Sequence, residues 1–384
     1  MIKIADPSKC CGCTACQAVC PKDTIIMKPD VLGFLYPQVD EDKCVDCGLC
    51  EKVCDFSSRY PQLNADSLRM NVYAVRHQDP EVVANSQSGG AFTVFSSSVL
   101  SEGGTVYGAV LNEDFTVSHV RACNEAERDK MRGSKYVQSE MGNSFRRIKE
   151  DLTEGRTVMF CGTPCQVAGL KSYIPINLQD KLVTIDFVCH GVPSPAIWKD
   201  YVTYRRGRRV LEQVSFRDKS CGWKSHVESF VYADGEKRLH KTFSTLFYKE
   251  VMHRDSCYAC PYSISERFSD ITISDFWGVA DVCEQYAGTE GTSMVVCQTA
   301  KGQKLFDKVS EVMKYQRVEI DVDFMLRYNP NMLRPTLIPK GRKQFVESYS
   351  KHGFLFVARR WSDIGFRNIL RKIKRKIKRI LNVK

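Results

Sequence analysis

The sequence predicts an α/β (α+β) fold in which a small cysteine-rich domain precedes a larger domain and a helical segment follows it. Three observations lead to this prediction. Half of the 18 cysteines lie in residues 1–54 of the 384-residue chain. Segments typical of strands and of helices then alternate, as they do in α/β proteins. Basic residues gather near the C-terminus, where residues 359–384 contain eleven lysines and arginines and one aspartate.

The composition is that of a globular protein, with 43% hydrophobic and 26% charged residues. The length suits two or three domains. No run of about 18 consecutive apolar residues occurs, so we expect no membrane-spanning helix, and the N-terminus lacks the apolar core of a signal peptide. We therefore expect a cytoplasmic protein whose thiols stay reduced. Metal or redox chemistry is the expected use of so many cysteines.

Two cysteine motifs with the spacing C-x-x-C-x-x-C-x-x-x-C define the expected first domain, residues 1–60. They begin at Cys10 and at Cys44. In this pattern three cysteines wrap a tight loop around three irons of a 4Fe-4S cluster, and the fourth, expected at the start of a helix, reaches the other cluster. The spacing predicts two clusters, one held by Cys10, Cys13, Cys16 and Cys54 and the other by Cys44, Cys47, Cys50 and Cys20.

Zinc and disulfides explain this doubled motif less well. A structural zinc site takes four ligands, usually from two C-x-x-C pairs, and a reducing compartment disfavours disulfides. Cys11 belongs to neither motif, and we expect a small buried thiol there. Residues 1–60 resemble bacterial two-cluster ferredoxins, which implies a module that carries single electrons and performs no substrate chemistry alone.

The larger domain is expected in two parts, residues 71–155 and 156–325, after a polar linker at residues 61–70. Apolar or alternating segments predict strands over residues 71–76, 105–111, 116–122, 156–160 and 182–188. The last two are apolar throughout, as in strands buried on both faces. Helices are expected over residues 91–100, 144–155 (with Ser144 as the cap) and 301–314. An Asp-Gly pair within residues 226–243 predicts a hairpin.

Four later cysteines are candidates for a third cluster. Cys165 and Cys189 each follow an expected strand, and Cys257 and Cys260 form a C-x-x-C pair. Loops at the carboxyl ends of strands meet at one crevice in open α/β sheets. A C-x-x-C pair can equally be redox-active or bind zinc, so these alternatives stay open. Cys161 is a fifth candidate, and the remaining cysteines are expected to be core thiols: Cys123, Cys221, Cys283 and Cys297.

Six motifs occur in a characteristic order: SQSGGAFT, RGSKYVQS, GTPCQVAGLK, VCHG, C-x-x-C-x-Y and SDITISDFWG. With them the chain resembles the beta-subunit family of coenzyme F420 hydrogenase and dehydrogenase over about residues 70–320. The resemblance implies FAD, one 4Fe-4S cluster, and electron transfer between iron–sulfur clusters and a deazaflavin or another organic acceptor. It implies that the cluster ligands are Cys165, Cys189, Cys257 and Cys260. It implies that the flavin contacts Ser88, Gly89, Gly90, Gly133, Ser134, Lys135 and Tyr136.

The chemistry of these residues agrees with the implied roles, although each has a simpler explanation. Glycines before a helix let backbone N–H groups approach a pyrophosphate, but most Gly-Gly pairs are only turns. Arg132 and Lys135 can offset the charge of a flavin, although most such side chains are solvated. His190 can relay a proton or merely fix its loop, and with Lys135 it is the candidate for catalysis. Asp275 and Trp277 either line the site or serve as a turn aspartate and a core tryptophan.

The final segment, residues 326–384, is expected to be helical and to end in a basic amphipathic helix. Isoleucines and leucines recur at helical spacing among lysines and arginines in residues 366–381. Such a helix lies in the plane of an anionic membrane surface. Docking on the body of the protein, a protein partner and a disordered tail are the alternatives, and the apolar stripe argues against nucleic acid. We expect residues 364–384 to attach the protein peripherally to the inner face of the cell membrane.

Together these features predict an iron–sulfur flavoprotein oxidoreductase. A one-electron donor, such as ferredoxin or a partner redox subunit, is expected to exchange electrons with the N-terminal clusters, then the third cluster, and then FAD. The substrate is expected to be a small or lipid-linked organic molecule, for example a deazaflavin or a cell-envelope polysaccharide precursor, with the direction of flow left open. The alternative is a non-catalytic electron-transfer subunit of a larger redox complex.

Overall fold

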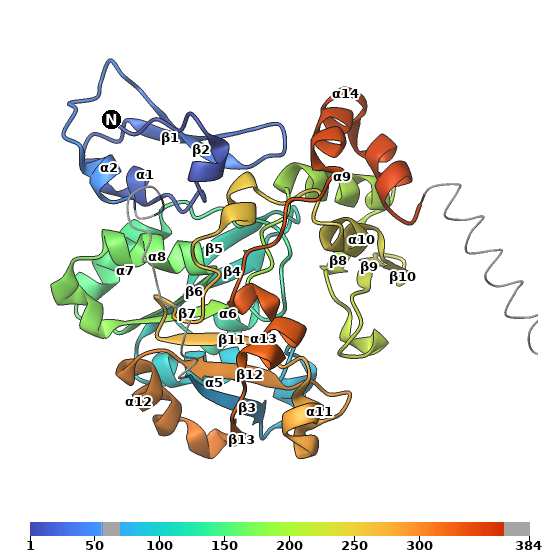
Figure 1. Ribbon diagram of the computed structural model, residues 1–384. Helices are drawn as coiled ribbons and strands as arrows, with labels where there is room; N and C mark the ends of the chain where they lie inside the picture. Colours follow the sequence, from blue (N-terminus) through green and yellow to red (C-terminus); the bar gives the residue numbers. More distant parts are fainter. Residues whose placement is uncertain (55, 57–69, 365–384) are drawn as a thin grey trace, which may run out of the picture.

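The computed structural model describes residues 1–54, 56 and 70–364 (Figure 1). The predicted linker at residues 61–70 and the predicted basic helix at residues 364–384 therefore lie outside the described residues, apart from Met70 and Ile364. In the described ranges, no helix combines the length and the apolar character needed to cross a membrane.

An eight-stranded mixed sheet forms the centre of the molecule, in the order β13-β3-β12-β11-β7-β6-β4-β5. Its strands are β3 (Asn71–His77), β4 (Thr105–Leu111), β5 (Val117–Ala122), β6 (Val158–Gly162), β7 (Leu182–Phe187), β11 (Ile271–Asp275), β12 (Ser293–Cys297) and β13 (Met313–Val318). Strands β4, β6, β7 and β11 run parallel to one another, and the outer pairs are antiparallel. The loops that follow β6, β7 and β11 therefore open at one edge of the sheet.

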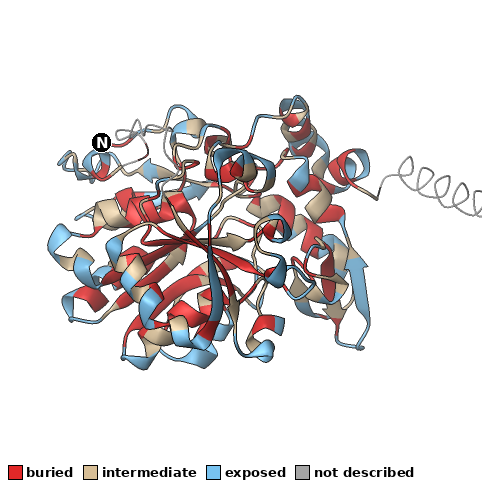
Figure 2. Ribbon diagram, turned by 60° about the horizontal axis from the view of Figure 1, so that its bottom comes forward, coloured by how far each residue is buried: buried red, intermediate tan, exposed pale blue. Residues whose placement is uncertain are grey.

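Helices pack on this sheet with their apolar sides inward, and Figure 2 shows buried strands at the centre with exposed outer helix surfaces. The helices are α4 (Pro80–Ala84), α5 (Ala91–Ser101), α6 (Glu125–Asp129), α7 (Ser144–Thr153), α8 (Pro164–Tyr173), α11 (Val279–Val282), α12 (Ala300–Lys308) and α13 (Val322–Tyr328). A capping box begins α8, because the Thr163 hydroxyl and the Gln166 side chain each bond the other residue's backbone N–H.

Two sequence predictions for these elements are wrong in detail. Asn143, not Ser144, is the N-terminal cap of α7. The helix predicted over residues 301–314 ends at Lys308, and Met313–Val318 forms strand β13 instead. This strand pairs with β3 over six residues, so backbone pairing at the sheet edge overrides the local helical pattern.

A second, smaller layer stands beside the central sheet (Figure 1). It contains a three-stranded antiparallel sheet of β8 (Leu211–Ser215), β9 (Glu228–Tyr232) and β10 (Lys237–His240), with α9 (Pro195–Arg206), α10 (Thr242–Tyr248) and α14 (Arg342–Trp361). The predicted hairpin is β9–β10, and Gly235 in its turn has a φ of +81°. The core of this layer is aromatic, with the Trp198 and Phe216 rings stacked at 4.0 Å.

The N-terminal domain comprises α1 (Ala15–Val19), β1 (Ile25–Pro29), β2 (Leu35–Val39) and α2 (Leu49–Lys52). It is packed into the rest of the protein rather than tethered to it. At the tip of the β1–β2 hairpin, the Leu32 carbonyl accepts hydrogen bonds from the Ser194 hydroxyl (2.6 Å) and the Ala196 N–H (3.0 Å). Arg146 of α7 donates to the carbonyls at the end of α1, where the helix leaves acceptors unpaired.

Helix α8 makes the closest approach to the N-terminal domain. Gly169 lies against Cys13, and a Cβ atom at Gly169 would stand 2.6 Å from the Cys13 Sγ atom. Such a distance is too short for a van der Waals contact, so only glycine fits at this position without a shift of the domain.

We expect Gly169→Ala to lower the thermal unfolding midpoint of the anaerobically purified protein. Alanine normally stabilises a helix interior by about 1 kcal/mol relative to glycine, whereas overpacking costs about 1–3 kcal/mol. Gly341→Ala is the matched control, because a Cβ there meets only the Trp361 Nε1 atom at 3.5 Å. A midpoint for Gly169→Ala at or above that of the wild type would contradict the close packing.

Candidate functional site

The first thiol set consists of Cys10, Cys13, Cys16 and Cys54. Burial and the neighbouring thiols of Cys13, Cys10 and Cys54 together raise the pKa of Cys16 well above its usual range. Burial also raises the pKa of Cys10, and the nearby thiols of Cys13 and Cys54 add to the rise. The structure thus brings Cys54 from the second motif to the three leading cysteines of the first motif.

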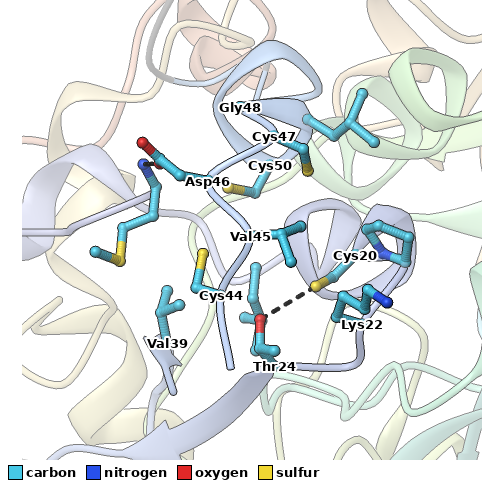
Figure 3. Close-up of a pocket in the computed structure, with 14 residues that line it drawn as sticks. Cys20, Lys22, Thr24, Val39, Cys44, Val45, Asp46, Cys47, Gly48 and Cys50 are labelled. Atoms are coloured by element: carbon cyan, nitrogen blue, oxygen red, sulfur yellow. Dashed lines mark hydrogen bonds and ion pairs between the residues drawn. The ribbon is translucent and has the colours of Figure 1, made fainter. Parts of the chain in front are cut away.

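The second thiol set consists of Cys20, Cys44, Cys47 and Cys50, which line one small pocket of the N-terminal domain (Figure 3). Cys20 lies 3.3 Å from the Thr24 hydroxyl, and the Ile2 N–H donates to the Cys50 sulfur at 3.3 Å. In this arrangement Cys20 lies with three cysteines of the second motif and Cys54 with three of the first, and their assignment as cluster ligands stays a prediction.

The local backbone of the two motifs is also repeated. Gly12 and Asp46, each two residues after the first cysteine of its motif, have φ values of +71° and +48°. Thr14 and Gly48, two residues further on, also have positive φ. These left-handed positions close the loop that carries the first three cysteines. The predicted helix position is wrong, because Cys20 caps the end of α1 and does not begin a helix.

The third thiol set consists of Cys165, Cys189, Cys257 and Cys260. Cys165 begins α8 after β6, Cys189 follows β7, and the other two come from the 3-10 turn Asp255–Ala259 and its C-terminal cap. Burial and the other thiols raise the pKa of Cys257 to about 12 and that of Cys260 to about 11. Burial raises the pKa of Cys189, and Cys257, Cys165 and Cys260 contribute to that rise. All four thiols are therefore mutual neighbours.

The arrangement of the thiols suits iron–sulfur clusters. Among the described residues, no three His, Cys, Asp or Glu side chains converge closely enough to hold one metal ion. The second thiol set lines a small pocket and the third borders a larger cavity. Space between the sulfurs fits a cluster whose irons each take one thiolate better than a single tetrahedral zinc ion. The residues present thus fit three 4Fe-4S clusters.

Cys11 is buried, as expected, but it lies between two thiol sets. The single proton of the Cys11 thiol is shared between the sulfurs of Cys13 in the first set and Cys165 in the third, and this contact lowers the pKa of both, that of Cys165 to about 7. Around it pack Phe56, Ala168 and Tyr262. Cys11 therefore bridges the first and third thiol sets, a position that spacing alone did not reveal.

A cavity of about 540 Å³ opens beside the third thiol set, at the sheet edge that faces the second layer. Seven residues predicted for flavin binding line it: Ser88, Gly90, Arg132, Gly133, Ser134, Lys135 and Tyr136. Gly89 does not line it. The Gly89 N–H donates to the Ser293 hydroxyl at 2.9 Å, and a Cβ there would stand 2.2 Å from the Val75 carbonyl oxygen, so this glycine serves close packing on the sheet.

Unpartnered hydrogen-bond donors identify the kind of ligand that this cavity fits. Of the described buried side-chain atoms without a partner, five that can donate belong to residues that line it: Gln87 Nε2, Thr93 Oγ1, Arg132 Nε, Arg267 Nε and Asn329 Nδ2. Buried polar groups are normally hydrogen-bonded. The cavity therefore suits a molecule rich in acceptors, and the pyrophosphate and ring carbonyls of FAD provide such acceptors.

Lys135 and His190, the candidates for catalysis, both line the cavity. The Lys135 ammonium donates to the carbonyls of Lys130, Met131 and Arg132 at 2.7–3.2 Å and so holds its own loop. Burial lowers the pKa of Lys135 to about 7. The His190 Nε2 atom lies 3.0 Å from the Glu250 carboxylate. Both contacts fix the side chains at the wall of the cavity.

The second layer and the loop after β11 together form a cavity wall that the sequence analysis largely missed. Trp277 lines the cavity and stacks on Trp223 at 5.1 Å, and the Trp223 indole N–H donates to Asp275 at 2.9 Å. Tyr248 and His226 complete this wall and hydrogen-bond to each other. Burial lowers the pKa of His226 to about 4, so its ring is neutral at pH 7. Trp277 is therefore not a core residue.

The other cysteines take no part in the three thiol sets. Cys161 stands in β6 at the cavity wall. Cys297 is a buried core thiol, as predicted, whereas Cys221 and Cys283 are half-buried. Cys123 is exposed, so the prediction of a core thiol is wrong there. Nothing in the sequence around Cys123 distinguishes a strand end at the surface from one in the core.

Comparisons with known proteins agree with this division of the chain. Residues 155–322 match the family model for the C terminus of the coenzyme F420 hydrogenase/dehydrogenase beta subunit. Residues 9–58 match that of a 4Fe-4S dicluster domain. A chain of the F420-reducing NiFe hydrogenase complex from Methanosarcina barkeri, determined in a xenon-derivatised form, is 17% identical, with a TM-score of 0.47, over 73% of this chain and 92% of its own. No curated protein shows significant sequence similarity to the chain.

The exchange of cysteines between the motifs makes a prediction about iron content. Cys10→Ser and Cys54→Ser should each remove one cluster, about four irons, and the double variant should lose no more than either single one. Cys44→Ser combined with Cys54→Ser should lose about eight. Iron is counted after anaerobic purification, with Cys123→Ser as the control for an exposed thiol. If Cys54 instead served the second set, the pair with Cys44 would lose only one cluster.

Proposed function

Because the chain belongs over residues 155–322 to the beta-subunit family of coenzyme F420 hydrogenase and dehydrogenase, and carries a 4Fe-4S dicluster domain at residues 9–58, we propose that it is an iron–sulfur flavoprotein oxidoreductase. The observation that carries the proposal is the order of the three thiol sets. They lead from the surface of the N-terminal domain to a single cavity that fits a flavin.

The second thiol set provides the entrance for electrons. Cys47 is exposed, so a one-electron donor protein can approach this set directly. The first thiol set lies nearer the body of the protein, and its Cys13 contacts Gly169 of α8. Cys11 then links the first set to Cys165 of the third set, which borders the cavity. Buried apolar side chains of Phe56, Ala168 and Tyr262 pack around this link.

The residues around the cavity suit FAD. When bound, FAD would supply the conversion between single electrons and a hydride. The N-terminal turn of α5 faces the cavity through Gly90, Ala91 and Phe92, and its unpaired N–H groups favour an anionic phosphate. Arg132 and Lys135 add positive charge on the same wall. These features support a dinucleotide that lies between α5 and residues 132–136.

The second layer supplies the substrate side of the cavity. Trp277, Tyr248 and the neutral His226 present flat apolar faces beside a few polar atoms. Such a wall suits a planar or ring-shaped organic substrate, such as a deazaflavin or a glycosyl ring of an envelope precursor. His190 can hold or release a proton at this wall, because its Nε2 atom is paired with Glu250.

Attachment to an anionic membrane surface is the remaining part of the proposal. It is supported by the sequence of residues 364–384, nearly all of which lie outside the described residues. The preceding helix, α14, ends at Trp361 in the second layer, on the same side of the molecule as the cavity wall formed by that layer. A membrane-proximal substrate would therefore meet the protein near this layer.

We expect the anaerobically purified protein to contain about twelve irons, four for each cluster, and to show flavin absorbance. About twelve irons without flavin would favour a non-catalytic electron-transfer subunit, and about four would reject the relay.

Because Lys135 has a pKa of about 7 without a bound flavin, binding of an anionic flavin should cause Lys135 to take up a proton. FAD affinity, measured by fluorescence titration of flavin-stripped protein, should therefore fall as the pH rises above 7.

Lys135→Met should weaken FAD binding and abolish this pH dependence. Lys130→Met, which removes a lysine that is exposed and does not line the cavity, is the matched control. An unchanged pH profile in Lys135→Met would show that another group accounts for the proton uptake.

Deletion of residues 366–384 should release the protein from anionic vesicles in a flotation assay, because it removes nine of the ten net positive charges that residues 359–384 carry with the apolar stripe. High salt should weaken binding of the full chain, and neutral vesicles should bind it less. Equal binding by the truncated protein would refute the membrane assignment.

A further inference from the structure

Arg254 is a fully buried cation at the junction of the N-terminal domain and the third thiol set. Its side chain has no exposed surface. The guanidinium donates to the Cys10 carbonyl at 2.7 Å, to the Leu35 carbonyl at 2.9 Å and to the Gln138 side-chain oxygen at 2.9 Å. It also stacks on the Tyr36 ring, with 4.1 Å between Cζ and the ring centroid.

The guanidinium directly approaches the first thiol set. The Arg254 Nη2 atom is 3.5 Å from the Cys10 sulfur. Gly12 makes room for it, because a Cβ at Gly12 would stand 2.8 Å from the Arg254 Nη1 atom. The glycine in the first motif therefore has two roles: it adopts a positive φ and it admits the arginine.

The same side chain acts on the third thiol set. Arg254 immediately precedes the turn that carries Cys257 and Cys260. Its charge interacts favourably with the sulfurs of Cys165 and Cys257 as well as with those of Cys10 and Cys13. The second thiol set is different, because the hydrogen bonds of Arg254 with described residues reach Cys10, Leu35 and Gln138 but none of its four cysteines.

A comparison with the other buried arginines shows what is unusual about Arg254. Arg128, Arg217, Arg267 and Arg342 each lie within 4.0 Å of a carboxylate oxygen. Within the described part of the chain, Arg254 has no carboxylate at that distance, although it is the most deeply buried of the five. A buried charge needs compensation. The Cys10 sulfur lies 3.5 Å from Arg254, whereas the Asp30 carboxylate interacts with it only from beyond 4.0 Å.

We propose that Arg254 is the shared counter-ion of the first and third iron–sulfur sites and raises the reduction potentials of both. Each one-electron reduction of a thiolate-bound cluster adds one negative charge, which a fixed cation nearby stabilises. Net charge and hydrogen bonds to the sulfurs are the means by which a protein sets such potentials. A single residue thereby keeps the reduction potentials of two successive sites of the relay close to each other. The inference rests on the proposed iron–sulfur sites.

The test is a redox titration, followed by electron paramagnetic resonance, of the full-length protein with its measured iron content. Arg254→Met should lower the midpoint potentials of the first and third iron–sulfur sites by at least about 59 mV each. This shift corresponds to a tenfold change in the equilibrium constant of a one-electron reduction. The midpoint potential of the second site should stay in place as an internal reference. Arg254→Lys keeps the charge and should restore both potentials.

Arg342→Met is the matched control, because Arg342 is a buried arginine at the start of α14 that pairs with Asp255 of the turn carrying Cys257. It should leave all three potentials unchanged. Unmoved potentials in Arg254→Met, or an equal shift of all three, would overturn the inference. If Arg254→Met does not retain iron, the Arg254→Lys variant provides the test instead. A lysine variant with its full iron content in which either of the two potentials falls by about 59 mV would overturn the inference, because it keeps the positive charge. A wild-type protein that holds no iron would instead reject the proposed function.

Discussion

The position of the first thiol set relative to the third depends on one turn of helix α8. Cys165 stands at the start of this helix, where the Thr163–Gln166 capping box fixes the first turn. Gly169 follows one turn later, on the same face, and accommodates Cys13. One helical turn rises about 5.4 Å. The rigid helix α8 therefore fixes the distance between the first and third thiol sets, which a flexible linker would not do. The hydrogen bonds of the half-buried Arg146 and of the hairpin tip then hold the N-terminal domain in place.

Many buried polar groups in the scaffold of the protein have hydrogen-bond partners, whereas several around the cavity have none among the described residues. Asp151, for example, is buried between β4 and α7 and accepts hydrogen bonds from Arg121, Tyr107 and Thr105. Such a network stabilises the fold and has no capacity left for a ligand. Around the cavity the opposite holds, since donors of Arg132 and Gln87 remain unpartnered. Because an unpaired buried donor costs about 1–3 kcal/mol, a ligand that satisfies several of them gains affinity from those hydrogen bonds.

The sequence predicted the parts of this structure that depend on local spacing. The cysteine motifs indicated which thiols group together, and the apolar runs before Cys165 and Cys189 indicated two central strands, β6 and β7. Strand β13 was not predicted, because its pairing with β3 is a contact between distant segments. The bridging position of Cys11 and the buried position of Arg254 depend on docking between domains, which leaves no periodic signal. The sequence left open whether Trp277 lines the site or belongs to the core. Its stacking partner Trp223 lies in a different layer of the fold, so the sequence does not show that the two rings meet.

The hairpin tip has a consequence for how the protein is made. Leu32 bonds to Ser194, 162 residues later in the chain. During synthesis the N-terminal domain therefore leaves the ribosome long before its docking surface exists, and its loops are open to solvent in that interval. Once α8 and α9 have folded, Cys11, Cys16 and the approach to Cys13 are covered. Delivery of iron and sulfide to the first thiol set is accordingly favoured before these helices have folded, whereas the second set, with its exposed Cys47, stays accessible in the folded protein.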